Sequence, residues 1–307
     1  MGDLLNCVGN TPLIELKSFS TRQVRLFAKL EMFNPTYSIK DRIVLHILTQ
    51  AKQKKLLHPG ATIIEATSGN TGAALAMMSA LMGHKVILTT PEKTSRAKVN
   101  AMQAYGADVR ISPASAKKGE PEHYISVAKE LHSSTPDSFM LNQYENPANI
   151  EAHYLTTGPE ILNQMKEKID YLVACGSSGG TITGVGRFLK EYLPEIKVVM
   201  PDPVGSVYYS YFKTGKIDKN VIQPYAVQGV GKDFICGCMD FSVLDDIVQF
   251  KDQDAFDSVK KLALQEGIFA GGSSGAALYA ADLLIKKIKR SANIVVIFPD
   301  SGLKYLV

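Results

Sequence analysis

Short β-branched segments alternate with helical segments along most of this 307-residue chain, and this alternation restricts the possible folds more than any other feature. In the first half, an apolar run at 61–65 is followed by a helical stretch at 72–81 and a second apolar run at 85–88. In the second half, segments of the same two kinds follow one another at 171–174, 181–192, 197–200, 274–289 and 293–298. Such alternation is typical of parallel sheets covered by helices on both faces. The sequence therefore predicts an α/β fold.

Length and composition narrow the class of protein further. At roughly 150 residues per domain, the chain allows about two domains. A composition of 45% hydrophobic and 21% charged residues excludes a disordered chain, a collagen-like fibre and a disulfide scaffold. Lys and Arg number 34 against 30 Asp and Glu, with no basic stripe among aromatic residues, so no nucleic-acid partner is expected. The turn signal at Asn146–Pro147 is a candidate domain boundary.

The cysteines and the apolar windows exclude other classes. Cys236 and Cys238 form the only close pair of the four cysteines, and no second pair or nearby histidine completes a zinc set. No metal site is predicted, and so few cysteines fit a reducing cytoplasm. The most apolar window, 72–83, is shorter than the roughly 20 residues that cross a bilayer, so no membrane association is expected.

Three glycine-rich junctions, at 67–72, 176–181 and 271–275, each follow a strand-like run and open a helix. Glycine lets the backbone approach a ligand, and the helix start offers free N–H groups and a positive dipole end. Each junction alone also fits a tight turn with a Ser or Thr cap. Three of them at the carboxyl ends of predicted parallel strands favour an anionic ligand, such as a phosphate or a carboxylate.

Common nucleotide and hydrolase motifs do not fit these junctions. The chain has no P-loop and no G-x-G-x-x-G pattern. Two junctions match G-x-S-x-G, but all six histidines precede Ser178, whereas a hydrolase needs one after its serine. Pyridoxal phosphate remains, which needs a lysine. Lys40 is attractive because it lies in the first turn of a helix with Ser38 as the N-cap, where the dipole favours the neutral amine, but the residues alone do not separate it from other lysines.

The segment Asn34–Arg42, N-P-T-Y-S-I-K-D-R, resembles the Schiff-base segment of the cysteine synthase and cystathionine β-synthase family. These are fold-type II, tryptophan synthase β-like pyridoxal-phosphate enzymes. The resemblance covers nearly the whole chain, with further matching segments at 9–13, 67–72, 142–149, 177–181, 228–231, 271–275 and 299–301. The chain is thereby identified as a member of this family, with pyridoxal 5'-phosphate as its cofactor.

The resemblance also implies roles for individual residues. Lys40 is the Schiff-base lysine that moves the α-proton, Asn70 binds the ring hydroxyl and Ser273 binds the pyridine nitrogen. The residues implied to wrap the phosphate are Ser177, Ser178, Gly179, Gly180 and Thr181. The residues implied to hold the substrate carboxylate are Thr67, Ser68, Thr71 and Gln143, and Gly229 lines the amine side.

Two family activities compete, and chain length favours the first. Cysteine synthases convert O-acetyl-L-serine and sulfide to L-cysteine and acetate. Cystathionine β-synthases join serine or O-acetylserine to homocysteine, and the segments 202–206 and 231–234 look closer to that group. A sulfide-releasing cysteine lyase is a further alternative. A non-catalytic ligand-binding relative is another, but intact Lys40 and Asn70 argue against it.

The resemblance implies a homodimer and two domains, and the cysteine usage predicts a cytoplasmic location. A smaller mobile domain spans 35–147 and carries the substrate loop, and a larger domain of 1–34 with 148–307 carries the phosphate loop. The expected partners are an amino-acid substrate and sulfide or a thiol. The sequence departs from the family at Ser177, where glycine is usual, and at Thr36–Tyr37, which replace small residues.

Overall fold

A computed structural model describes residues 3–67, 69–117 and 119–306, and within them the chain divides into two compact units. The smaller unit comprises Met1–Val8, Asn34–Gln143 and Lys304–Val307, and the larger comprises Gly9–Phe33 and Tyr144–Leu303. The expected domains had bounds at 34/35 and 147/148 and left both chain ends in the larger one. In the structure, both ends belong to the smaller unit. That the smaller domain moves stays a prediction.

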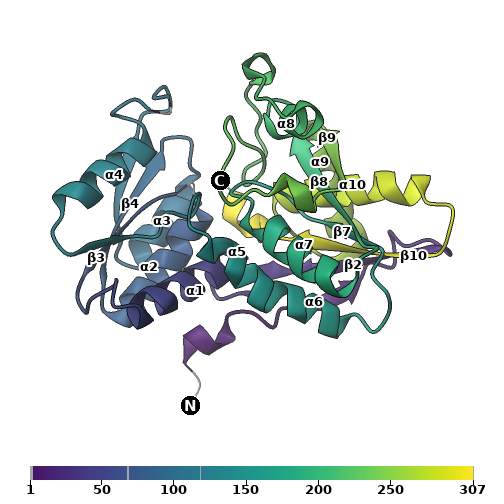
Figure 1. The fold of residues 1–307 in the computed structure, drawn as a ribbon, viewed down its shortest axis with the longest axis horizontal. Helices are drawn as coiled ribbons and strands as arrows, with labels where there is room; N and C mark the ends of the chain where they lie inside the picture. Colours follow the sequence, from purple (N-terminus) through teal and green to yellow (C-terminus); the bar gives the residue numbers. More distant parts are fainter. Residues whose placement is uncertain (1–2, 68, 118, 307) are drawn as a thin grey trace. The chain divides into compact units, whose positions relative to one another are not determined.

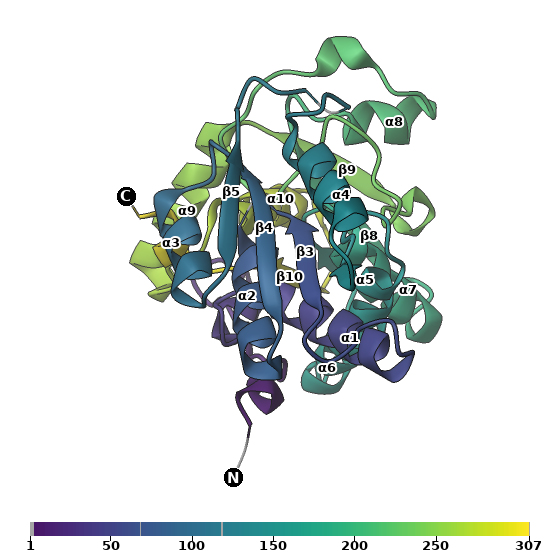
Figure 2. The same cartoon turned by 90° about the vertical axis from the view of Figure 1, so that its left-hand side faces the viewer.

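The smaller unit is built around a four-stranded parallel sheet in the order β5-β4-β3-β6. Its strands are β3 (Thr62–Ala66), β4 (Lys85–Pro91), β5 (Asp108–Ser112) and β6 (Ser138–Met140). Its helices are the 3-10 turn η1 (Leu4–Cys7), α1 (Lys40–Gln53), α2 (Asn70–Met82), α3 (Arg96–Ala104) and α4 (Tyr124–Ser134). Figure 2 shows β5, β4 and β3 side by side.

The larger unit is built around a six-stranded sheet in the order β1-β2-β10-β7-β8-β9. Its strands are β1 (Leu13–Glu15), β2 (Val24–Leu30), β7 (Tyr171–Val173), β8 (Lys197–Pro203), β9 (Asp246–Phe250) and β10 (Ala292–Phe298). Its α-helices, labelled in Figure 1, are α5 (Ala148–Ala152), α6 (Gly158–Gln164), α7 (Gly180–Tyr192), α8 (Tyr208–Thr214), α9 (Asp252–Glu266) and α10 (Gly272–Lys287). The shorter helical segments are η2 (Glu31–Phe33), the π-helix η3 (His153–Thr157), η4 (Lys219–Val221), η5 (Phe241–Val243) and η6 (Gly302–Tyr305).

Strand order decides which face each helix covers. Chain connections run from β3 to β4 to β5 in one direction, then return past β3 to β6. Because crossovers between parallel strands are right-handed, α2 and α3 cover one face of this sheet and α4 covers the other. In the larger unit the same rule separates α7 from α9 and α10. The predicted α/β fold with helices on both faces is confirmed. The one antiparallel pair, β1 with β2, lies at an edge.

Apolar packing explains why these segments adopt these elements. Strand β10 is buried along almost its whole length, as expected for a central strand covered on both faces. Helix α10 packs against it through alanines, which allow a close approach of helix to sheet. In the smaller unit, α4 contributes Ala128 to a cluster with Ile64 and Ala66 of β3. Burial of this kind contributes about 25 cal/mol per Å² of apolar surface.

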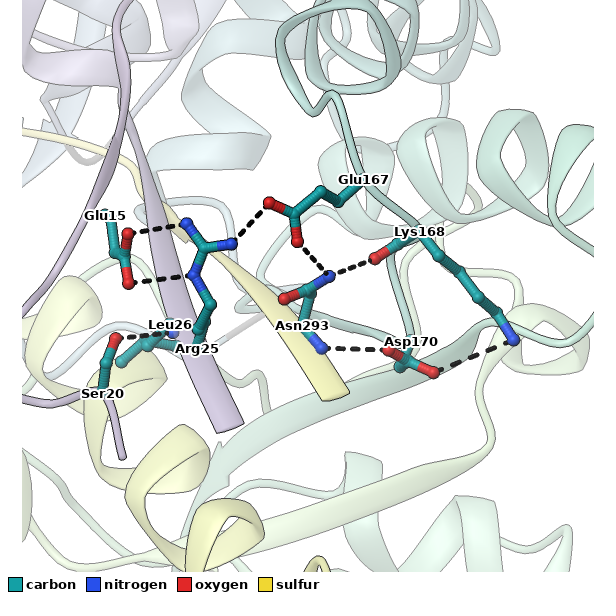
Figure 3. A network of polar contacts seen from close by, with 8 residues as sticks. All are labelled: Glu15, Ser20, Arg25, Leu26, Glu167, Lys168, Asp170 and Asn293. Atoms are coloured by element: carbon teal, nitrogen blue, oxygen red, sulfur yellow. Dashed lines mark hydrogen bonds and ion pairs between the residues drawn. The ribbon is translucent and has the colours of Figure 1, made fainter. Parts of the chain in front are cut away.

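A polar network ties the amino ends of β2, β10 and β7 together (Figure 3). The guanidinium of Arg25 donates to both carboxylate oxygens of Glu15, at 3.1 and 2.8 Å, and to Glu167 at 2.5 Å. Asn293 donates its side-chain amide to the carbonyl of Lys168 at 2.7 Å and its backbone N–H to Asp170 at 2.9 Å. Since Arg25 is only half-buried and Glu167 is exposed, the ion pairs stabilise the fold little. The network aligns the strands from the end opposite to their carboxyl ends.

Candidate active site

Each sheet has one point at which the strand order reverses. In the smaller unit it lies between β3 and β6, and in the larger unit it lies between β7 and β10. Open α/β sheets bind their ligands at the carboxyl ends of strands beside such a point. The segments that follow these four strands contain most of the predicted site residues: Thr67, Asn70, Thr71, Gln143, Ser177, Ser178, Gly179, Gly180 and Thr181.

At the reversal point of the smaller unit, hydrogen bonds join Thr71 to Gln143 and separately tie Thr67 to the start of α2. The Thr71 hydroxyl donates to Gln143 Oε1 at 2.7 Å, and Gln143 Nε2 donates to the Ala66 carbonyl at 3.0 Å. Thr67 Oγ1 accepts the backbone N–H groups of Gly69 and Gly72, both at 3.1 Å. The first turn of α2 is therefore held against the end of β6. The fourth predicted carboxylate ligand, Ser68, lies outside the described residues.

The buried carboxyl group of Glu65 holds the backbone of the segment that contains Gln143. Glu65 Oε2 accepts the Asn142 backbone N–H at 2.8 Å, and Oε1 accepts that of Gln143 at 3.2 Å. Burial raises the pKa of Glu65 to about 7, although these backbone donors act in the opposite direction. The sequence analysis missed Glu65. The available signal was a single carboxylate within the apolar strand Thr62–Ala66.

Lys40 is the first residue of α1, as the sequence analysis placed it near a helix start. The N-cap position falls on Ile39, one residue later than expected, because Ser38 precedes the helical backbone. The buried Ser38 hydroxyl still accepts the Lys40 backbone N–H at 3.3 Å. The following carboxylate, Asp41, accepts the backbone N–H of Thr36 at 2.7 Å and also its hydroxyl. The backbone around Lys40 is thus fixed from both sides.

Asn70 lies in the first turn of α2, and Tyr37 lies in the turn before Lys40. Tyr37 has a φ of +59° and a side chain that is 58% exposed. A positive φ is the conformation for which glycine is the least costly residue. This explains why small residues suit the position where this chain carries tyrosine.

In the larger unit, the loop after β7 places two glycines at the start of α7. Gly179 has a φ of +95°, and a Cβ there would lie 2.5 Å from Met239 Cα. A Cβ on Gly180 would lie 1.9 Å from Asn149 Oδ1. Neither position has room for a side chain, so the backbone N–H groups at this helix start are left uncovered by side chains of their own. Such a helix start fits a phosphate group.

Three residues outside the loop hold its polar groups in place. Asn149 Nδ2 donates to Ser178 Oγ at 3.0 Å, and Thr181 Oγ1 lies 3.1 Å from His153 Nε2. The Tyr208 hydroxyl donates to the Ser177 carbonyl at 2.5 Å. The sequence analysis assigned no role to Asn149, His153 or Tyr208. Asn149 lay in a matching segment, but nothing in the sequence placed the π-helix of His153 or the start of α8 beside this loop.

Ser273 is buried in the first turn of α10, and its carbonyl accepts the Cys175 thiol at 3.1 Å. Cys175 follows β7, so this bond ties α10 to the same end of the sheet as the phosphate loop. Burial raises the pKa of the Cys175 thiol well above its ordinary value. This thiol is therefore a neutral structural group. The only side-chain group that Ser273 offers to a ligand is its uncharged hydroxyl.

The Gly229 segment is anchored to the same region. Gly229 has a φ of +79°, and a Cβ there would meet nothing within 4 Å. Gly231 donates its N–H to the Gly176 carbonyl at 2.7 Å, and its Cα packs on Pro203 and Ser206. The Ser206 hydroxyl oxygen accepts the Lys232 backbone N–H at 3.1 Å. Burial raises the pKa of the neighbouring Asp202 to about 7, against the effect of Ser206 and the Tyr209 N–H.

The described residues provide neither a metal-binding cluster nor a membrane-spanning helix. Across residues 3–67, 69–117 and 119–306, His, Cys, Asp and Glu side chains nowhere gather in a group of three that could hold a metal ion. Over the same ranges, every helix is too short or too polar to cross a membrane.

The chain is similar in sequence and in structure to known proteins. A family model described as pyridoxal-phosphate dependent enzyme matches residues 4–300. Cystathionine beta-synthase of Apis mellifera is 43% identical over 310 residues, which cover 100% of this chain and 60% of that protein. A cysteine synthase of Staphylococcus aureus is 38% identical over 307 residues, covering 99% of this chain and 95% of that one. The crystal structure of O-ureido-L-serine synthase superposes with a TM-score of 0.91 at 32% identity, covering 100% and 93% of the two chains.

The coverage differs between the relatives. The chain spans 60% of the length of the Apis mellifera protein and 54% of that of the rat cystathionine beta-synthase, but nearly all of the Staphylococcus aureus protein. Features of the candidate site fit the groups of pyridoxal phosphate. The uncovered N–H groups at the start of α7 fit its phosphate, the lysine in the first turn of α1 fits its aldehyde, and the buried serine of α10 fits its ring nitrogen. By the match over residues 4–300 and these identities, the chain belongs to the pyridoxal-phosphate-dependent enzyme family.

Proposed function

We propose that this enzyme catalyses β-replacement on an L-serine derivative, converting O-acetyl-L-serine and sulfide to L-cysteine and acetate. The observation that carries this proposal is the joining of Thr71 and Gln143 at the first turn of α2. An ordered hydroxyl and an amide at the start of a helix suit the carboxylate of an amino acid. The Staphylococcus aureus cysteine synthase, matched over 95% of its length, supports the choice of donor and nucleophile.

The cofactor would be held by the residues that the family resemblance assigns to it. Lys40 binds it covalently, Asn70 binds its ring hydroxyl and Ser273 binds its pyridine nitrogen. The residues that bind its phosphate are Ser177, Ser178, Gly179, Gly180 and Thr181. When bound, pyridoxal phosphate supplies an electron sink for the carbanion formed at the substrate Cα. Because Ser273 is a neutral donor, it stabilises a charged pyridine nitrogen less than a carboxylate does, which favours elimination over transamination.

The chain's own residues then move one proton and orient the substrate. Thr67, Ser68, Thr71 and Gln143 hold the substrate carboxylate, and Gly229 lines the amine side without a side chain. Lys40 removes the α-proton, and the Cβ–O bond breaks with its electron pair leaving on acetate. Sulfide forms the Cβ–S bond, and Lys40 returns the proton to Cα. The sum is one C–O bond exchanged for one C–S bond, with no oxidant or reductant.

Cystathionine synthesis from serine and homocysteine is the second candidate. The 43% identity to the Apis mellifera enzyme supports it. So does the segment Asp202–Ser206, which looked closer to that group: Ser206 holds the backbone of Lys232, three residues after Gly229. The two candidates differ in the nucleophile, and also in the group that leaves Cβ, which is acetate from O-acetylserine and water from serine.

The direct test offers each donor with each nucleophile to the purified holoenzyme. O-acetylserine, serine and cysteine are supplied separately, with sulfide or homocysteine, and products are identified by mass spectrometry. The first candidate predicts cysteine from O-acetylserine and sulfide as the pair with the highest kcat/KM. Turnover of serine with homocysteine alone would replace the first candidate by the second. Failure of every pair would overturn β-replacement itself.

Lys40→Ala tests the assignment of the catalytic lysine. We expect kcat to fall by more than about 1000-fold, because a covalent anchor and a proton carrier are lost together. The lysine-bound cofactor absorbance should also disappear. Lys52→Ala, an exposed lysine of the same helix, is the control and should keep both. Full turnover by the Lys40 variant would refute the assignment.

The family resemblance also leads us to infer a homodimer and a mobile smaller domain spanning 35–147. Light scattering coupled to size exclusion measures the mass of the assembly directly, and a monomer at micromolar concentration would contradict the first inference. Small-angle scattering with and without a substrate analogue tests the second, since closure lowers the radius of gyration.

A further inference from the structure

Lys232 is fixed by its backbone within the segment that follows Gly229. Its N–H donates to Ser206 Oγ at 3.1 Å, and its carbonyl accepts the Val207 N–H at 2.9 Å. The preceding residue, Gly231, is bonded to the carbonyl of Gly176 just before the phosphate loop. Lys232 lies three positions after Gly229, a span of at most about 10 Å along the chain. The backbone of Lys232 is therefore held close to the segment assigned to the amine side of the substrate.

Two aromatic rings also hold its ammonium. Lys232 Nζ lies 4.6 Å from the ring centroid of Tyr144 and 5.7 Å from that of Phe234, and 3.4 Å from the Tyr144 hydroxyl oxygen. The two rings meet edge to face at 6.0 Å. Rings attract a cation and orient it, but they do not neutralise it. The side chain is thus directed and keeps its charge.

No carboxylate in the described part of the chain forms an ion pair with Lys232, although the residue is only half-exposed. Other lysines of the larger unit differ: buried Lys29 is 2.7 Å from Glu160, and Lys197 is 3.1 Å from Asp245. A partly desolvated cation is usually compensated by an anion. At Lys232 the protein supplies rings and a hydroxyl, which leaves ammonium protons for an anionic ligand.

We propose that Lys232 binds a negatively charged group of a substrate other than the α-carboxylate of the serine derivative. This inference rests on the proposed function and makes Lys232 a specificity-determining residue for it. The anionic oxygens have two possible sources: the carboxylate of an amino-acid thiol acceptor, or the phosphate of an O-phosphorylated serine donor. Lysine, as a compact point charge with three donors, suits either.

The test compares Lys232→Met and Lys232→Arg with the wild type on three substrate pairs. The pairs are O-acetylserine with sulfide, O-acetylserine with homocysteine, and O-phosphoserine with sulfide. Lys232→Met should lower kcat/KM for an anion-bearing pair about 10- to 100-fold more than for O-acetylserine with sulfide, as expected for a hydrogen bond to a charged group. Lys232→Arg should restore most of it. Loss confined to homocysteine identifies the carboxylate, and loss confined to O-phosphoserine identifies the phosphate.

Ionic strength supplies a readout that a structural role would not move. In the wild type, kcat/KM for the anion-bearing pair should fall as salt rises, and Lys232→Met should flatten that dependence. Equal losses on all three pairs, or an unchanged salt dependence, would overturn the proposal. So would a wild type that accepts only O-acetylserine with sulfide, although β-replacement would then stand. If the wild type turns over no pair, the proposed function fails first.

A change in folding is checked separately. The thermal midpoint of Lys232→Met should stay close to that of the wild type and its cofactor absorbance should be unchanged, because the contacts removed are those of one ammonium with two rings at a half-exposed site. If Lys232→Met unfolds, Lys232→Gln on the same three pairs decides the question, since it keeps a polar donor of similar length. A neutral glutamine that discriminates the pairs as the wild type does would refute an electrostatic role.

Discussion

The reversal points of the two sheets are built from different materials. In the smaller unit, side chains do the work: the Thr71 hydroxyl, the Gln143 amide and the buried Glu65 carboxyl form one connected group. In the larger unit the backbone provides the polar groups, because Gly179 and Gly180 have no side chains to cover the N–H groups at the start of α7. Side chains there, such as Asn149, bond to the loop from outside.

This difference matches two kinds of ligand group. A phosphate presents oxygens in several directions and is satisfied by backbone N–H groups that are fixed once the loop has folded. An amino-acid carboxylate must be bound and released in each cycle, and side-chain hydroxyls and amides adjust at small cost. Substitutions in the phosphate loop of the larger unit should therefore affect cofactor binding, whereas substitutions of Thr71 or Gln143 in the smaller unit should affect substrate binding.

The largest effect is expected from Gly179→Ala. The new methyl would lie 2.5 Å from Met239 Cα at a φ of +95°, so the loop must move. We expect the cofactor Kd to rise by more than about 100-fold, measured by spectroscopic titration of apoenzyme. Gly267→Ala is the matched control: it also has a positive φ, +68°, but open space around it, and should lose only about 1 kcal/mol of stability. Normal cofactor binding by Gly179→Ala would refute a backbone-built phosphate site.

Both units contain a buried carboxyl group with a raised pKa, Glu65 in the smaller unit and Asp202 in the larger. Replacing each by its amide should affect stability differently. Burial raises the pKa values of Glu65 and Asp202 to about 7, so ionising either one in the folded state is costly. The folded protein then binds more protons than the unfolded chain between about pH 4 and 7, and the free energy of unfolding falls as pH rises through that range. Above pH 7 the loss is complete, at about 3 kcal/mol for each group.

Asp202→Asn should remove its share of this loss. Asp202 Oδ2 accepts the Tyr209 N–H at 2.9 Å, which an asparagine oxygen can also accept, while Oδ1 has no hydrogen-bond partner in the described structure. Urea titrations at pH 5 and pH 8 should show a flatter dependence. Glu65→Gln is the contrast, because both of its oxygens accept backbone N–H groups and an amide would present a donor to one of them. Stabilisation by Glu65→Gln at pH 8 would contradict this comparison.

Thr71→Val tests the smaller unit directly. Losing the hydroxyl that donates to Gln143 should lower kcat/KM about 10- to 100-fold, with the cofactor Kd changed by less than about threefold. Thr71→Ser keeps the hydroxyl and should retain most activity. If Thr71→Val weakens cofactor binding as much as substrate binding, the assignment of Thr71 to the substrate and of the phosphate loop to the cofactor is wrong.

The sequence predicted the glycine-rich loops after β3 and β7 better than it predicted the residues that support them. Hydrophobic runs and glycine-rich junctions are local signals, so the α/β fold and the loops after β3 and β7 could be inferred from them. The contacts of Asn149, His153 and Tyr208 with the phosphate loop depend on how separate elements pack. No local pattern encodes such packing, and the same holds for Glu65, whose partners lie 77 and 78 residues away.

Tyr208→Phe tests one of those supports. The lost hydroxyl donates to the Ser177 carbonyl at 2.5 Å, and it fixes the loop at the residue where this chain departs from the usual glycine. We expect the cofactor Kd to rise about fivefold to tenfold, as for one buried hydrogen bond, with KM for the donor little changed. Tyr211→Phe, in the same helix, is the control. A rise in KM alone would place Tyr208 in substrate binding instead.

The smallest effect is expected from Tyr37→Gly, which asks whether the turn before Lys40 tolerates a side chain at positive φ, as the phosphate loop at Gly179 does not. Tyr37 has a φ of +59°, yet its exposed ring meets no obstacle of the kind found at Gly179. Glycine relieves a backbone strain of about 1–2 kcal/mol but gains about 0.5–1 kcal/mol of unfolded-chain entropy, so the net stabilisation is less than about 1 kcal/mol. Urea unfolding measures it. A loss above about 1 kcal/mol would mean that the tyrosine ring itself stabilises the turn before Lys40.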